Sequence, residues 1–213
     1  MKRKQSFDTV AIAALIWIAI LTTAQRAAAH HPMGNKIPSN FFEGFMSGLG
    51  HPIIGVDHFA FVVAIGLLAA TQMRGFLIPA AFSLATMAGT GIHLMSVDIP
   101  ANEIAIAISV IAFGGMIVLQ KSPNLPLLVV IGTIAGIFHG YAYGEAIVGA
   151  EMTPLVAYLA GFALIQYAIA MLALWIGKSA MKKASNISIP AIRFSGSAIC
   201  LIGVVFLTSS IFV

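Results

Sequence analysis

Three ionisable residues lie inside apolar stretches of the sequence, where charged side chains are rare. Asp57 and His58 are adjacent in one stretch, and His139 lies in another. An ionisable group within a membrane span costs about 2.5 to 3.5 kcal/mol even on a lenient insertion scale, so such a residue indicates a function. Two imidazoles and a carboxylate suit a borderline divalent ion such as nickel, cobalt or zinc. The residue types predict a metal site, with a structural ion pair as the alternative.

A second histidine and a second carboxylate are spaced regularly from these residues. His51 precedes Asp57 by six positions, and Glu145 follows His139 by six. If the two helices run in opposite directions, His51 lies level with Glu145, and His139 lies level with Asp57 and His58. Six helical residues span about 9 Å. The spacing therefore predicts a deep site of Asp57, His58 and His139 below a mouth formed by His51 and Glu145.

The elements that must position these residues are membrane helices. The 213 residues are 60% hydrophobic and only 8% charged, whereas soluble domains carry about 25% charged residues. Each span needs about 20 residues, so no sizeable soluble domain fits beside the spans. We expect an all-α, polytopic membrane helix bundle. Its predicted spans are Ile53–Thr71, Gly75–Ser96, Ala101–Leu119, Leu125–Tyr143, Thr153–Ile176 and Ile192–Phe212.

The amino terminus has the pattern of a secretory signal peptide. Three basic residues at positions 2–4 precede an apolar run over 10–21, and alanines follow at 27–29. This order of regions is typical of a cleaved signal. We expect residues 1–29 to be a signal peptide and residues 30–213 to form a single domain of six transmembrane helices. Retention of the signal would make seven.

Basic residues predict the orientation of the bundle. The links after the first, third and fifth spans contain Lys or Arg, and the intervening links contain neither. By the positive-inside rule the basic links face the cytoplasm, so both ends of the mature chain are expected to be periplasmic, in a bacterial inner membrane. All six histidines then lie in the outer half of the protein or outside it: His30, His31, His51, His58, His93 and His139.

Four further residues are candidate metal or pathway residues. His93 and Glu103 lie at span ends, where a ligand and an interfacial side chain are equally consistent with the sequence. His30 and His31 would stand at or near the mature amino terminus, where they could chelate a metal or belong to a solvated tail.

Several classes of protein are excluded or disfavoured by missing motifs. The sequence contains no phosphate-binding loop and no dinucleotide fingerprint. Its lone Cys200 rules out a Cys-rich metal site. We therefore expect no nucleotide or nucleic-acid partner and no tightly bound cofactor. The expected partners are a divalent transition-metal ion and the lipid bilayer.

Two long motifs contain most of these candidate residues. The first is His51-Pro52-Ile53-Ile54-Gly55-Val56-Asp57-His58, and the second is Phe138-His139-Gly140-Tyr141-Ala142-Tyr143-Gly144-Glu145. Both resemble the signatures of the HupE/UreJ family of nickel and cobalt permeases. Many relatives carry further histidines in the second motif, where this chain has Tyr141 and Tyr143.

The resemblance implies a secondary permease or facilitator, not an enzyme, that imports Ni²⁺ or Co²⁺. It also implies that the residues matching the motifs bind the metal. Two other classes remain open from the residues. A membrane haem protein for electron transfer would use His58 and His139 as axial ligands, and a membrane metal-dependent hydrolase would use a metal to activate water.

Overall fold

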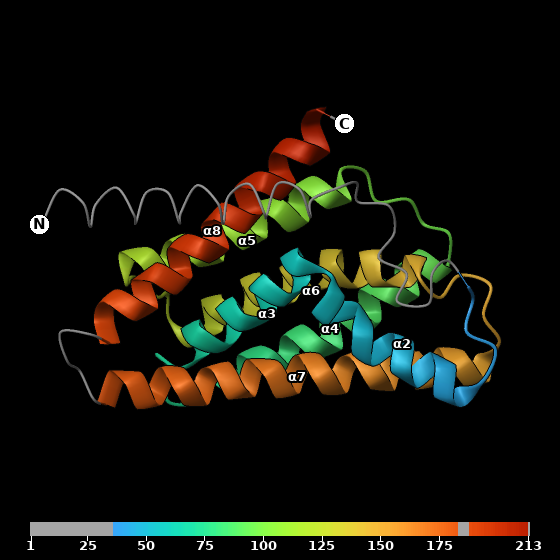
Figure 1. Ribbon diagram of the computed structural model, residues 1–213, viewed down its shortest axis with the longest axis horizontal. Coiled ribbons are helices and arrows are strands. Elements are labelled where there is room, and N and C mark those ends of the chain that lie inside the picture. Colours follow the sequence, from blue (N-terminus) through green and yellow to red (C-terminus); the bar gives the residue numbers. More distant parts are fainter. Residues whose placement is uncertain (1–35, 183–187, 213) are drawn as a thin grey trace, which may run out of the picture.

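The computed structural model describes residues 36–182 and 188–212, which form seven helices and no strand (Figure 1). The predicted signal peptide, His30 and His31 lie outside the described residues. Helices α4 to α8 are each long and apolar enough to cross a membrane, and α2 and α3 together pass as one bent span. The expected all-α membrane bundle is confirmed. Its helices are α2 (Phe41–Ile54), α3 (Val56–Ala69), α4 (Leu77–Leu94), α5 (Asn102–Leu119), α6 (Leu125–Glu145), α7 (Met152–Lys182) and α8 (Ser188–Phe212).

The first predicted span differs from the structure at its start. The sequence predicts one helix over 53–71, but α2 and α3 meet at Gly55 and are bent by 78° there. Gly55 is extended, with φ −70° and ψ 101°. A Cβ atom at this position would lie 2.6 Å from Cδ2 of His58. The missing side chain therefore allows the His58 ring to pack over the break.

Helix α2 itself is absent from the predicted spans, although its start carries a capping pattern. The side chain of Asn40 accepts the backbone N–H of Glu43 at 2.9 Å, and the Glu43 carboxylate accepts the backbone N–H of Ser39 at 2.8 Å. Such reciprocal bonds are typical of a helix amino terminus. With 14 residues, α2 is too short to span a membrane alone. A search for long apolar stretches therefore does not find it, whereas a search for caps would.

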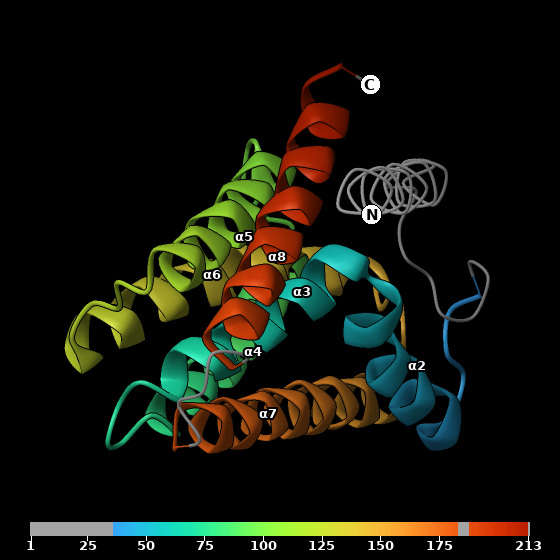
Figure 2. The same cartoon turned by 60° about the vertical axis from the view of Figure 1, so that its left-hand side comes forward.

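Helix α3 occupies the centre of the bundle. Helices α2, α4 and α5 pack most extensively on α7, α6 and α8 respectively, and α3 contacts both α7 and α5 (Figures 1 and 2). Ten of the 14 residues of α3 are buried, among them Phe61, Ile65 and Leu68 in the hydrophobic core. The first turn of this helix thus carries Asp57 and His58 into the interior.

Glycines bring α4 and α6 into close contact. A Cβ atom at Gly140 would collide with the backbone of Thr86, and one at Gly144 would lie 2.6 Å from Cβ of His93. Small residues allow helix backbones to approach each other in this way. Gly140 and Gly144 are spaced four residues apart on α6, and both face α4. This contact holds the turn of α6 that carries His139.

Basic residues gather at one end of the bundle. Arg74 lies between α3 and α4, Lys121 between α5 and α6, Lys182 at the end of α7 and Arg193 near the start of α8. Figure 1 shows these helix ends together at the left. The links from α4 to α5 and from α6 to α7 lie at the opposite end and contain no Lys or Arg. The alternation of charge along the sequence thus becomes a separation of charge in space.

Candidate metal centre

Three histidines from three helices meet inside the bundle. His51 lies near the end of α2, His58 in the first turn of α3 and His139 on α6, and each is at most 2% exposed. Nδ1 of His58 lies 2.9 Å from Nδ1 of His139, and the ring centres of His51 and His58 are 5.8 Å apart. In a straight helix the seven residues from His51 to His58 would span about 10 Å. The bend at Gly55 therefore assembles the cluster.

The structure groups these residues differently from the predicted deep site and mouth. The predicted convergence of His58 and His139 is observed. His51 lies beside His58 and not in a separate mouth with Glu145, because the depth prediction assumed an unbroken helix. Glu145 is the last residue of α6, and its side chain is exposed.

Two tyrosines enclose His51. The hydroxyl of Tyr158 on α7 donates to the backbone oxygen of Tyr143 at 2.8 Å and lies 2.9 Å from Nδ1 of His51. A hydroxyl has one proton, so Tyr158 accepts from His51, whose Nδ1 must carry the ring proton. The neutral ring then has its lone pair on Nε2. The sequence reasoning missed Tyr158, although a hydroxyl in an apolar span is a recognisable signal.

Ser109 on α5 orients His139 by the same logic. The Ser109 hydroxyl donates to the backbone oxygen of Ile106 at 2.6 Å, and it lies 3.0 Å from Nε2 of His139. Ser109 therefore accepts the Nε2 proton, which leaves the lone pair of His139 on Nδ1. His58 donates from its own Nδ1 to that atom. Ring contacts support this arrangement, since Phe61 stacks on His139 with centroids 4.3 Å apart.

The spacing of the two Nδ1 atoms is that of a hydrogen bond, and it is also that of two ligands in cis positions on one ion. Two nitrogens bound in cis positions, each 2.0–2.1 Å from a metal, would be about 3 Å apart. The observed separation is 2.9 Å. His139 can keep its bond to Ser109 while its Nδ1 binds metal, which is the usual support for a metal-binding histidine. His58 must first move its proton from Nδ1 to Nε2.

Three carboxylates lie near the histidine cluster. Asp57 is 2% exposed and lies in the first turn of α3, where the helix dipole favours an anion. Glu103, at the start of α5, lies within electrostatic range of Asp57 and Glu145. The predicted candidates Glu103 and Glu145 thus belong to an acidic zone beside the histidines. Within residues 36–182 and 188–212, the structure shows no group of three or more His, Cys, Asp or Glu side chains arranged to hold a metal ion.

The two motifs that supply this cluster lie within the part of the chain that matches a known family model. A family model described as HupE / UreJ protein matches residues 18–206. The chain belongs to the HupE/UreJ family. Protein HupE of Rhizobium leguminosarum bv. viciae is 27% identical over 189 residues, which cover 88% of this chain and 96% of that protein. No solved structure matches the chain.

His93 lies apart from the cluster in this HupE/UreJ family member. Its ring packs against Tyr141 with centroids 4.5 Å apart. Both residues line a hollow of about 270 Å³ at the end of the bundle opposite the basic residues, together with Asp98 and Ser96. The structure therefore places His93 beside this hollow and not beside His58 and His139.

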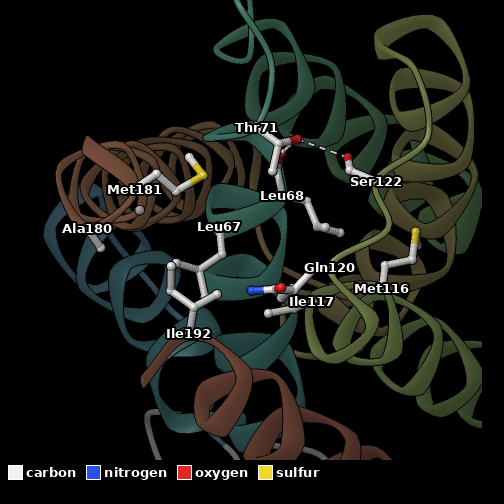
Figure 3. A pocket seen from close by; sticks show the side chains of 11 residues that line it. Leu67, Leu68, Thr71, Met116, Ile117, Gln120, Ser122, Ala180, Met181 and Ile192 are labelled. Atoms are coloured by element: carbon white, nitrogen blue, oxygen red, sulfur yellow. Dashed lines mark hydrogen bonds between the residues drawn. The ribbon is translucent and has the colours of Figure 1, made fainter. Parts of the chain in front are cut away.

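A separate apolar cavity lies at the basic end of the bundle (Figure 3). It has a volume of about 280 Å³ and is formed by α3, α5, α7 and α8. Side chains such as Leu67, Ile117 and Met181 point toward it, and the hydroxyl oxygens of Thr71 and Ser122 lie 2.9 Å apart across its rim. None of the described residues lining it is a histidine or a carboxylate. The cavity offers no imidazole or carboxylate to a transition metal, so the histidine cluster is the candidate centre in the HupE/UreJ fold.

Proposed function

We propose that this protein is a secondary permease that carries Ni²⁺ or Co²⁺ inward across the bacterial inner membrane. Membership of the HupE/UreJ family, which is associated with nickel and cobalt transport, supports the class of cargo. The observation that carries the proposal is the pair of imidazole nitrogens, 2.9 Å apart, on His58 and His139 in the interior of a membrane bundle. Imidazole suits these two ions, and a single structural hydrogen bond would not need Asp57 beside the pair.

The residues of the centre have complementary roles in this proposal. His58 and His139 bind the ion through Nδ1, His51 approaches through Nε2, and Asp57 supplies negative charge. Glu103 and Glu145 raise the local concentration of cations at the outer end. The Nδ1 atoms of His58 and His139 are hydrogen-bonded to each other. Their rings must therefore rotate so that both lone pairs point at the ion.

The electrical potential of the membrane supplies a driving force. An inside-negative potential contributes about 2.3 kcal/mol per charge per 100 mV, or about 4.6 kcal/mol for a divalent cation. The sequence has no nucleotide-binding motif. We therefore propose transport down the electrochemical gradient.

The alternative functions fit the geometry less well. Haem needs its axial ligands on opposite faces of the macrocycle, whereas His58 and His139 are in direct contact. A hydrolase needs a nucleophile or a general base near the metal. Two hydroxyls contact the cluster, those of Ser109 and Tyr158. Each donates its hydrogen bond to a backbone carbonyl. A binding and transport role therefore fits these residues better.

Nickel uptake by cells provides the test of this function. His58→Asn should reduce uptake of radioactive nickel to the level of cells without the protein. Thr208→Val is the control, because it removes a polar group that bonds only within α8, away from the cluster, and we expect it to retain wild-type uptake. Equal uptake by His58→Asn and the wild type would refute the proposed centre.

The proposed orientation has its own test. We propose that the cluster lies on the periplasmic side and that the mature termini are periplasmic, because the basic links lie at the other end of the bundle. Reporter fusions at Lys121 and Lys182 should be cytoplasmic, and fusions at Asp98 and at the carboxyl terminus should be periplasmic. A cytoplasmic carboxyl terminus would contradict this topology.

A further inference from the structure

A second group of buried polar side chains lies near the histidines but outside their hydrogen bonds. Gln166 on α7 and Thr86 on α4 are fully buried, and Ser83 is 8% exposed. Nε2 of Gln166 donates to Oγ1 of Thr86 at 2.6 Å. The Thr86 hydroxyl donates to the backbone oxygen of Ser83 at 2.8 Å. We call Ser83, Thr86 and Gln166 the inner polar group.

The hydrogen bonds of this group determine which amide atom of Gln166 faces Thr86. The single hydroxyl proton of Thr86 goes to the Ser83 carbonyl, so Thr86 must accept from Gln166. Oε1 of Gln166 then has no hydrogen-bond partner in the part of the chain that the structure describes, and the same holds for Oγ of Ser83. Buried polar atoms nearly always have a partner. Two such oxygens in one group point to a ligand that binds there.

The inner polar group adjoins the turn of α6 that carries His139. The backbone of Thr86 is in contact with Gly140, the next residue after His139. The ring of Phe82, which precedes Ser83, lies 5.9 Å from the His139 ring. A ligand leaving His139 therefore has this group as a neighbour.

Helix α7 places Gln166 on the inward side of the cluster. Tyr158, Phe162 and Gln166 are fully buried and spaced four residues apart, so they share one face of α7. Tyr158 contacts His51, and Gln166 lies about 12 Å further along the helix axis. From there α7 continues to its basic end at Lys182. Gln166 thus lies between the histidines and the end of the bundle that we place in the cytoplasm.

We propose that the inner polar group is a second, transient binding site for the divalent cation after it leaves the histidine cluster. The inference rests on the proposed function. The ligands are neutral oxygens, namely Oε1 of Gln166 and Oγ of Ser83, and water completes the shell of a partly hydrated ion. Neutral oxygens hold nickel or cobalt less tightly than imidazole does. Passage through a membrane requires sites that release the ion as well as bind it, and this group has that property.

Two substitutions at Gln166 test the proposal in opposite directions. Gln166→Leu keeps the volume but removes the oxygen, and it should slow nickel uptake about tenfold without weakening nickel binding by the purified protein. Gln166→Glu adds a charge, so equilibrium binding should reveal a second bound nickel ion, and uptake should slow because release is slower. Thr133→Val is the control, because it also removes a polar side-chain atom within the bundle, one that bonds only to its own helix, and we expect wild-type uptake.

The outcomes separate this inference from the function on which it rests. Wild-type uptake by Gln166→Leu would overturn the inference. If Gln166→Leu does not reach the membrane, Gln166→Glu decides, and wild-type uptake without a second bound ion would overturn the inference. Failure of the proposed function looks different, because the wild-type protein would then neither take up nickel nor bind it.

Discussion

The two ends of α3 lie in opposite environments. At its start, Asp57 and His58 belong to a cluster in which buried rings and hydroxyls are linked by hydrogen bonds across five helices. At its other end, Leu67 and Leu68 line the apolar cavity (Figure 3). The polar groups there, Thr71 and Ser122, bond to each other at the rim. The proposed metal ligands are therefore confined to one end of a helix that is mostly buried.

Packing differs between the two ends as well. Near the cluster, α4 and α6 touch backbone to backbone at Gly140 and Thr86. At the basic end, α8 packs mainly on α5 and only lightly on α7, and the cavity lies between them. Close packing holds ligand atoms in place, whereas a loosely packed region opens at a lower free-energy cost. The contrast indicates a rigid binding end and a more deformable end where the ion would leave.

Gly140→Ala should have the largest effect on the binding end. The added methyl group collides with the backbone of Thr86, so α4 and α6 must separate and His139 must move. We expect nickel binding to be lost and the protein to be destabilised by about 1–3 kcal/mol, as measured by thermal unfolding and equilibrium binding in detergent. Gly91→Ala is the control, because its Cβ meets nothing within 4 Å. Similar behaviour of both variants would contradict the rigid-end interpretation.

Tyr158→Phe should weaken nickel binding about 10–100-fold, the usual cost of removing a residue that orients a ligand. The variant removes the hydroxyl that accepts from Nδ1 of His51, so the ring no longer has a preferred tautomer. Titration of the purified protein with nickel measures the effect. Tyr167→Phe, on the same helix and half-buried, should bind as the wild type does. Unchanged binding by Tyr158→Phe would remove His51 from the proposed centre.

Ser109→Ala should have a smaller effect, at most about tenfold on nickel affinity. His139 loses the acceptor for its Nε2 proton, but Phe61 still stacks on its ring. The same nickel titration serves as the measurement, with Ser197→Ala on α8 as the control, since that hydroxyl bonds only within its own helix. Wild-type affinity in Ser109→Ala would show that ring packing alone orients His139.

Ala180→Leu should have the smallest effect and tests the independence of the other end. Ala180 lines the apolar cavity, which has space for a larger side chain. We expect unchanged nickel affinity and a stability change of less than about 1.5 kcal/mol by thermal unfolding. Weaker nickel binding would show that the cavity and the histidine cluster are coupled, and the contrast between the two ends would then fail.

The sequence alone determined the class of fold and the identity of the main candidate residues. A composition with so few charges excludes a soluble domain, and any ionisable residue within a span is conspicuous against it. Asp57, His58 and His139 are therefore recognisable without a structure. The HupE/UreJ motifs identify the family, because they depend only on the order of residues along the chain.

Only the tertiary structure decided how these residues are grouped. The bend at Gly55 places His51 beside His58 instead of in the predicted mouth. Counting residues along a regular helix cannot predict such a bend. Three residues matter because of hydrogen-bond partners on other helices. The partner is 107 positions away in sequence for Tyr158, 30 for Ser109 and 80 for Gln166. Hydrogen bonds between residues so far apart in sequence form only when the faces that carry them meet inside the bundle. That arrangement comes from close packing at glycines, which only the assembled bundle displays.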